Sequence, residues 1–159
     1  MRIVARRELV IFACLTALAW PALAQIGRLQ TFEKGDLSIR TKTGTHKFRI
    51  EIARRPDQFT QGLMFRRHLA ADAGMLFLYA RATRATMWMK NTYIPLDMIF
   101  IDRKGKIAGF RERTIPQSLA VISSEKPVSA VLEVNAGTVA RLKISIGDQV
   151  LHPAFGGAE

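Results

Sequence analysis

Two apolar segments, residues 87–92 and 96–102, lie on either side of a proline and carry polar residues among apolar ones. Both have the length of ordinary β-strands and a composition that is compatible with strands. Pro95 cannot donate a hydrogen bond to a β-ladder, so residues 93–95 are expected to interrupt the pairing. The sequence therefore predicts two strands of a sheet, with Lys90 and Asp97 set among apolar neighbours.

The rest of the chain predicts further short strands and a few short helices. In residues 46–52, a histidine and three apolar residues at the even positions alternate with charged residues at the odd positions. This period of two indicates that residues 45–53 form a half-buried hairpin with residues 37–41. A helix is expected to begin around Pro56 and to end near Met64. Other predicted elements are strands at 74–79, 106–112 and 128–134, a helix at 138–143, two short strand pieces within 144–151, and loops at 81–86 and 113–127.

Residues 1–24 have the order of a secretory signal peptide. Three arginines precede an apolar run at residues 9–20, and the residues up to Ala24 fit the small-x-small cleavage pattern. The run is short for a membrane span, although a retained anchor is the alternative. We expect cleavage near Ala24, a periplasmic or secreted location, and no stable transmembrane span after processing. Residues 25–35 are predicted to be a linker or mobile start, 36–153 a single domain, and 154–159 a tail.

Charge and cysteine content limit the possible functions. The full chain carries a formal charge of +11, and removing residues 1–24 takes away three arginines and one glutamate, which leaves +9. The basic residues are scattered, and an exported destination argues against nucleic acid, so we expect only loose attraction to anionic envelope surfaces. The single cysteine, Cys14, lies in the signal segment, so the processed chain has no disulfide and no thiol nucleophile.

Several short motifs occur in a fixed order along the domain. They are Gly-Leu-Met-Phe-Arg at 62–66, Gly-Met-Leu-Phe at 74–77, Trp-Met-Lys-Asn-Thr at 88–92, Ile-Pro-Leu-Asp at 94–97, Phe-Ile-Asp at 100–102, Val-Leu-Glu-Val-Asn-Ala-Gly at 131–137 and Gly-Asp at 147–148. In these motifs the chain resembles domain-of-unknown-function family 192, over about residues 39–151. The resemblance implies an α+β fold, a compact, mostly antiparallel barrel-like β-sheet with two or three short helices. It implies no activity and no catalytic residues.

Residues 88–92 carry the side chains best suited to a ligand. On an extended strand, Trp88, Lys90 and Thr92 would share one face, and Asn91 would lie on the other. An indole beside an ammonium group and a hydroxyl suits a sugar or a carboxylate, because the ring can stack while the lysine holds an anionic group. The alternative is a lysine that covers a core tryptophan. The predicted ligand-binding residues are Arg66, Trp88, Lys90, Asn91, Thr92 and Asp97.

Asp97 opens an apolar strand, where an unpaired carboxylate is costly. Its partner could be Arg66, Lys90 or backbone amides, or it could bind a ligand or transfer a proton. Asp102 is five residues away on the same strand and would point to the opposite face, so these two carboxylates do not form a pair. Glu133 could approach Asp97 from another strand and form the acid and base of a glycoside hydrolase. The alternative is that Glu133 is an ordinary strand residue.

The sequence favours no metal and no cofactor. His46, His68 and His152 have no paired spacing of the kind that binds zinc, and a glycine-rich phosphate loop is absent. Methionine sulfur can bind cuprous ion, but filling of the core is the more frequent use of this residue. The methionines in question are Met64, Met75, Met87, Met89 and Met98.

Three functional hypotheses follow. The first is an exported, non-catalytic domain that binds a small anionic or sugar-like envelope ligand near Trp88, with Arg66 and residues 113–127 at the border of the site. The second is a hydrolase of envelope glycan that uses Asp97 and Glu133. The third is a structural or partner-binding module whose polar residues serve only the fold.

Overall fold

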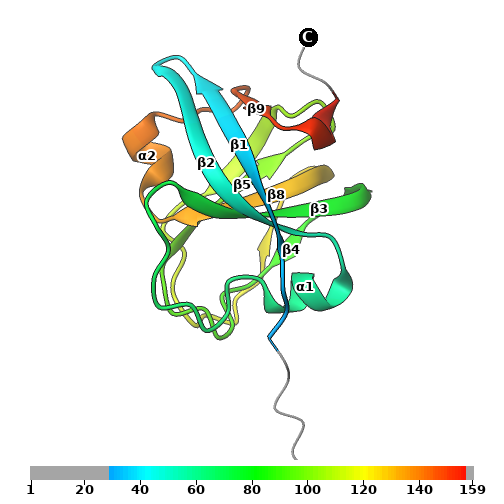
Figure 1. The fold of residues 1–159 in the computed structure, drawn as a ribbon, viewed down its shortest axis with the longest axis vertical. Helices are drawn as coiled ribbons and strands as arrows, with labels where there is room; N and C mark the ends of the chain where they lie inside the picture. Colours follow the sequence, from blue (N-terminus) through cyan, green and yellow to red (C-terminus); the bar gives the residue numbers. More distant parts are fainter. Residues whose placement is uncertain (1–28, 157–159) are drawn as a thin grey trace, which may run out of the picture.

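The structure is a computed structural model that describes residues 29–156 (Figure 1). One sheet has seven strands in the order β6-β5-β8-β3-β2-β1-β9, and β4 pairs with β7 in a second sheet. The strands are β1 (Glu33–Thr41), β2 (Gly44–Ala53), β3 (Ala73–Thr83), β4 (Thr86–Met87), β5 (Leu96–Ile101), β6 (Ile107–Arg111), β7 (Ile122–Ser123), β8 (Val128–Asn135) and β9 (Gln149–Leu151). The helices are α1 (Pro56–Gln61), α2 (Thr138–Leu142) and a 3-10 turn, η1 (Pro153–Phe155).

The seven-stranded sheet curls into a half-barrel. Its strands pair antiparallel except for β2 and β3, which are parallel. An isolated bridge between Lys106 and Gln149 joins the residue before β6 to β9, so the two edges of the sheet meet at one end. The predicted α+β fold, with a mostly antiparallel barrel-like sheet and short helices, is confirmed.

The predicted hairpin at residues 37–41 and 45–53 is formed by β1 and β2. Phe48, Ile50 and Ile52 are buried on one face of β2, as their alternation predicts. The first strand begins at Glu33, so the predicted linker at 25–35 ends inside β1. Similarly, η1 overlaps the start of the predicted tail at 154–159. The predicted signal peptide, residues 1–24, lies outside the described residues.

The sheet carries an apolar core on each face. In β3, Leu76 and Leu78 join a core to which all seven strands contribute, so this core fills the inside of the half-barrel. Met75 and Phe77 point the other way into a second core, which α1 and the segment before β5 cover. Strand β5, between β6 and β8, is buried over its whole length. The functional residues considered below lie mostly around the second core.

Several sequence predictions about local structure are wrong. The predicted loop at 113–127 contains β7, and residues 144–151 contain one strand, β9, instead of two short pieces. Residues 87–92 do not form a strand, because β4 ends at Met87 after pairing at only two positions with β7. The chain instead turns, and the Thr92 N–H donates to the carbonyl of Met89 at 3.0 Å. The predicted loop at 81–86 is also too long, since β3 continues to Thr83. Alternating apolar residues predict which side chains are buried, but a strand also needs a neighbouring strand to pair with.

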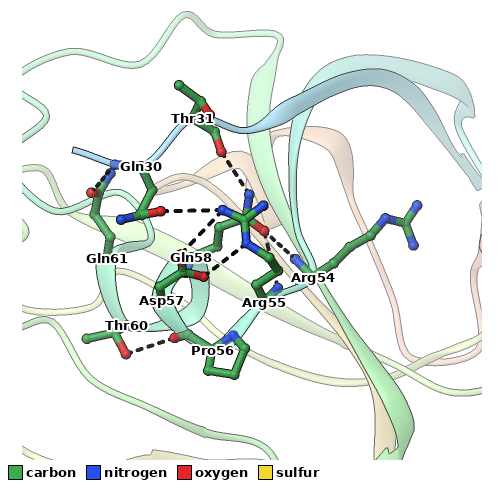
Figure 2. Close-up of polar contacts among 9 residues, drawn as sticks. All are labelled: Gln30, Thr31, Arg54, Arg55, Pro56, Asp57, Gln58, Thr60 and Gln61. Carbon is green, nitrogen blue, oxygen red and sulfur yellow. Dashed lines mark hydrogen bonds and ion pairs between the residues drawn. The ribbon is translucent and has the colours of Figure 1, made fainter. Parts of the chain in front are cut away.

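Helix α1 is held in place by the buried side chain of Gln58 (Figure 2). Its Oε1 accepts the backbone N–H groups of Arg54 at 2.9 Å and Arg55 at 3.2 Å, and its Nε2 donates to the Thr31 carbonyl at 2.8 Å. Gln61 of the same helix accepts the N–H of Gln30 at 2.6 Å. One glutamine therefore ties the residues before β1, the end of β2 and the start of α1 together.

Replacing Gln58 by leucine should lower the free energy of unfolding by about 2 kcal/mol, because two backbone N–H groups and one carbonyl lose their partner in a buried place. Urea denaturation measures the change. Thr60→Ala, at an exposed position of the same helix, removes a hydrogen bond to the Pro56 carbonyl. It should lower the free energy of unfolding by less than about 1 kcal/mol. Equal losses for the two variants would contradict the role assigned to Gln58.

Candidate functional site

A small pocket opens between α1 and the segment that follows β4. It has a volume of about 50 Å³, enough for a few non-hydrogen atoms. Strands β3 and β8 form its floor, and its walls come from the end of α1 and from residues 86–92. Its lining includes Phe59, Gly62, Met64, Phe77, Trp88, Thr92 and Glu133. The pocket thus brings together three of the residues that the sequence singles out, namely Trp88, Thr92 and Glu133.

Glu133 is the most unusual residue of this pocket. It lies on β8 opposite Met75 of β3 and Met98 of β5, so its carboxyl group enters the apolar second core. Only 4 % of the residue is exposed, and burial raises its pKa to about 8. No hydrogen bond joins this carboxyl group to another residue in the described range 29–156, and its oxygens reach the open space of the pocket rather than being fully enclosed. At neutral pH the group is therefore mainly protonated, and it can donate a hydrogen bond to whatever occupies the pocket.

Tyr79 lies close to the same region. Burial, and then the charge of Glu133, raise the pKa of its phenol to about 12. Its hydroxyl group donates to the sulfur of Met87 at 3.6 Å, and its ring lies 5.5 Å from that of Phe59. The tyrosine is therefore neutral at physiological pH and belongs to the apolar wall behind the pocket.

Trp88 and Lys90 lie together at the mouth of the pocket and are exposed. The Lys90 ammonium group stands 5.1 Å from the centre of the Trp88 ring, within the range of a cation–π contact. The indole is 43 % exposed, whereas the intervening Met89 is fully buried. Trp88 and Lys90 thus share one side as the alternation predicts, although a turn rather than a strand places them there.

Asn91 and Thr92 shape this turn. Asn91 has a left-handed backbone with φ of 54°, which asparagine tolerates better than most residues, and its carbonyl accepts the Phe65 N–H at 2.8 Å. Thr92 is buried against the pocket, and its carbonyl accepts the Gln117 N–H at 3.0 Å. The predicted border formed by residues 113–127 therefore contacts this segment through the backbone.

Asp97 is fully buried at the start of β5, away from the pocket. Its Oδ1 accepts the backbone N–H of Arg113 at 2.8 Å, and its Oδ2 accepts that of Val139, in the first turn of α2, at 2.9 Å. Of the partners that the sequence leaves open, the structure selects backbone amides rather than Arg66 or Lys90. Asp97 therefore anchors α2 and the loop after β6 to strand β5.

Arg66 also lies apart from Trp88 and Lys90. Its guanidinium group forms two hydrogen bonds of 2.7 Å and 2.6 Å with the carboxylate of Glu51 on β2. The Arg66 side chain is therefore half-buried and held in an ion pair with another residue of the protein. The pocket lining does not include Arg66.

Asp97 and Glu133 point to opposite faces of the sheet. In the register of β5 and β8, Asp97 stands opposite Val134 and Met98 stands opposite Glu133. Val134 belongs to the core inside the half-barrel, and Met98 belongs to the second core. A two-carboxylate hydrolase needs both groups on either side of one bond, and the sheet separates them. The predicted acid and base pair is therefore not formed.

Comparison with known proteins identifies the family. The profile of family DUF192, described as "Uncharacterized ACR", matches residues 38–152. The chain belongs to the DUF192 family. A crystal structure from Sinorhizobium meliloti 1021, described as a candidate transcription regulator, is 46% identical with a TM-score of 0.74, covering 77% of this chain and 95% of that one. A protein of unknown function from Novosphingobium aromaticivorans DSM 12444 is 35% identical with a TM-score of 0.76, covering 79% and 89%. No curated protein matches.

The methionines of this DUF192 domain gather around the second core. Met75, Met89 and Met98 are buried in it, and Met64 and Met87 line the pocket. Sulfur atoms of Met64, Met87 and Met89 accept hydrogen bonds from Asn91, Tyr79 and Thr114. Within residues 29–156, no three His, Cys, Asp or Glu side chains are grouped as for a metal ion. Nor does any helix in that range have the length and apolar character needed to cross a bilayer.

Sequence reasoning missed the part of the pocket that α1 supplies. Phe59 of this helix forms the wall of the pocket beside Tyr79 and Phe77. The available signal is Gly62, which follows the helix and lets it approach β3 closely. A Cβ atom there would lie 3.0 Å from Cζ of Phe77, and the residue has a φ of 45°. A glycine that lets a helix end approach an aromatic floor indicates a pocket edge.

Proposed function

We propose that this DUF192 domain is an exported, non-catalytic binding protein that holds a small sugar-like ligand of the cell envelope at the Trp88 pocket. The observation that carries the proposal is the Glu133 carboxyl group, which faces the pocket without a hydrogen-bond partner among residues 29–156. A carboxyl group whose oxygens face a pocket and have no protein partner is free to bond to water or to a ligand atom. An exposed indole next to such a group is a typical arrangement for sugar binding.

The pocket dimensions narrow the chemistry of the ligand. A volume of about 50 Å³ admits one small substituent, such as an acetamide or a hydroxymethyl group, and leaves the rest of the ligand outside. A protonated Glu133 would donate to the oxygen of that substituent, and the apolar wall of Phe59 and Phe77 would contact its carbon atoms. The pyranose ring would then stack on Trp88, with Lys90 placed to hold an anionic group.

The same geometry favours binding over hydrolysis. Glu133 is the only carboxylic acid among the residues that line the pocket. Asp97 lies on the other face of the sheet, where it accepts two backbone hydrogen bonds. The helices do not favour a DNA-binding role of the kind that the description of the Sinorhizobium meliloti relative suggests. Helices α1 and α2 have six and five residues, too short to serve as recognition helices in a major groove.

Titration calorimetry with N-acetylglucosamine, N-acetylmuramic acid and glucose tests the proposal. We expect the N-acetylated sugars to bind more tightly than glucose, and Trp88→Ala to weaken their binding at least tenfold because the stacking surface is lost. Lys90→Ala should weaken binding of the acidic N-acetylmuramic acid more than that of neutral N-acetylglucosamine.

Tyr93→Ala is the matched control for Trp88→Ala. Tyr93 is another exposed aromatic residue with a cation over its ring, Arg67 at 5.3 Å, but it does not line the pocket. Its loss should leave sugar binding within about twofold. If no sugar binds, or if Trp88→Ala binds like the unaltered protein, the proposal is rejected. If Lys90→Ala lowers the stability of the protein and leaves ligand binding unchanged, the structural-module hypothesis would be supported instead.

A further inference from the structure

Three loops meet at one end of the domain, at the lower left of Figure 1. They are residues 62–72 after α1, residues 88–95 before β5, and residues 112–121 after β6; together we call them the loop end. Backbone hydrogen bonds join them, from Phe65 to Asn91 at 2.8 Å, from Gln117 to Thr92 at 3.0 Å and from Met89 to Ser118 at 3.1 Å. The loops therefore form one continuous surface rather than three independent segments.

This surface concentrates the exposed apolar side chains. Of the eight large hydrophobic residues that are exposed in the described chain, only Leu29 and Ile146 lie elsewhere. Clustered exposure of this kind marks an interaction surface, whereas single exposed residues do not. The six residues of the loop end are Phe65, Trp88, Tyr93, Ile115, Leu119 and Val121.

Basic side chains surround these apolar residues. Arg67, Lys90, Arg111 and Arg113 lie on or beside the loop end, and none of them forms a salt bridge within residues 29–156. Arg111 and Arg113 border a hollow of about 310 Å³ that Ile115 and Val121 also line. Glu112, which lines the same hollow, is the single acidic residue of the loop end that is not in a salt bridge, since Asp72 pairs with Arg49. The local charge is therefore positive around an apolar centre.

We propose that the loop end docks on the surface of an anionic lipid bilayer. Ile115, Leu119 and Val121 would enter the boundary between headgroups and acyl chains, while Trp88 and Tyr93 would lie at headgroup level. The arginines would contact lipid phosphates, and the net charge of +9 that remains without residues 1–24 would attract the whole domain to the same surface. The surface has aliphatic side chains at its centre, with aromatic residues and cations around them. This order matches the acyl chains, headgroups and phosphates of a bilayer.

The docking surface shares Trp88 and Lys90 with the sugar site, but its aliphatic residues are separate from the pocket. Leu119 and Val121 do not line the pocket, and Glu133 and Phe59 do not lie on the loop end. The two proposals can therefore fail independently. Leu119→Asp should leave sugar binding unchanged, and Glu133→Gln should leave docking unchanged.

Co-sedimentation with vesicles tests docking, using a chain that begins at Gln25 so that the apolar run at 9–20 does not contribute. Such a chain keeps every described element, and 95% of the Sinorhizobium meliloti chain corresponds to this domain in its crystal structure. We expect at least tenfold tighter binding to vesicles of phosphatidylglycerol and phosphatidylcholine than to phosphatidylcholine alone. The binding should weaken as salt is raised, because phosphate contacts with the arginines are screened.

Two pairs of variants separate the apolar and the ionic contributions. Leu119→Asp should reduce vesicle binding at least tenfold, whereas Ile146→Asp, which changes an equally exposed residue outside the loop end, should stay within twofold. Arg111→Gln combined with Arg113→Gln should remove most of the preference for anionic vesicles. Arg103→Gln combined with Lys104→Gln, in the turn at the far end of β5, should not.

Three results would overturn the docking proposal. They are equal binding to both kinds of vesicle, equal effects of Leu119→Asp and Ile146→Asp, and a dimer in sedimentation velocity that Leu119→Asp dissociates. The last result would assign the loop end to contact between two copies of the chain.

Discussion

Replacing Glu133 by glutamine should stabilise the protein by about 4 kcal/mol at pH 8. Burial raises the pKa of this carboxyl group from 4.5 to about 8 in the folded protein, so folding opposes its ionisation. Between pH 4.5 and about pH 8, the folded state therefore binds more protons at Glu133 than the unfolded state does. The free energy of unfolding of the unaltered protein should therefore fall, relative to Glu133→Gln, by about 1.4 kcal/mol for each pH unit over this range.

Urea denaturation of both proteins from pH 4 to pH 9 measures this difference. It should be small near pH 4, grow with pH and level off above pH 8. Glu125→Gln, which removes a carboxyl group from an exposed position, controls for the loss of one carboxyl group as such. A difference between Glu133→Gln and the unaltered protein that does not change with pH would show that Glu133 is not buried as a neutral acid.

Asp97→Ala should destabilise the protein by about 3 to 5 kcal/mol. The substitution leaves the N–H groups of Arg113 and Val139 without their acceptor, and the second of these lies in the buried interior together with Asp97. Hydrogen bonds to a carboxylate acceptor are among the stronger ones. Such a loss is a large share of the total stability of an ordinary domain. Denaturant unfolding, or the temperature midpoint by circular dichroism, measures it.

Asp102→Ala is the matched control for burial. Asp102 also accepts two backbone N–H groups, from Lys104 at 2.8 Å and Lys106 at 2.9 Å, but these bonds are in an exposed turn. Water can replace the lost acceptor there, so we expect a cost of about 1 kcal/mol. Comparable losses at both positions would mean that burial does not set the contribution of Asp97.

Much of the fold could be predicted from local patterns. The alternation in β2, the apolar runs of β3, β5 and β8, and the helix start at Pro56 are confirmed because each depends on neighbouring residues. The strand predicted at 87–92 is wrong because Trp88, Met89 and Lys90 alternate between exposed and buried within a turn. Periodicity reports which side a residue faces, and it does not report whether a second strand is available to pair.

The candidate site could be predicted only in part. Trp88, Lys90 and Thr92 come from one short segment, so the sequence could place them together. Glu133 and Asp97 lie on neighbouring strands, and a register shift of a single residue would have put them on the same face. Phe59 reaches the pocket because its ring packs beside Phe77 of β3, while Gln58 ties the same helix to the residues before β1.

The sequence alone determined the family and the alternation of buried residues. It also indicated that the Asp97 carboxylate needs a partner. Only the tertiary structure decided that Asp97 is satisfied by backbone amides, that Glu133 faces a pocket beside Trp88, and that three separate loops form one apolar and basic surface. The physical reason is that side-chain chemistry and periodicity are local properties. Strand register, helix docking and loop contacts join residues that lie far apart along the chain, and their outcome depends on how the whole sheet closes.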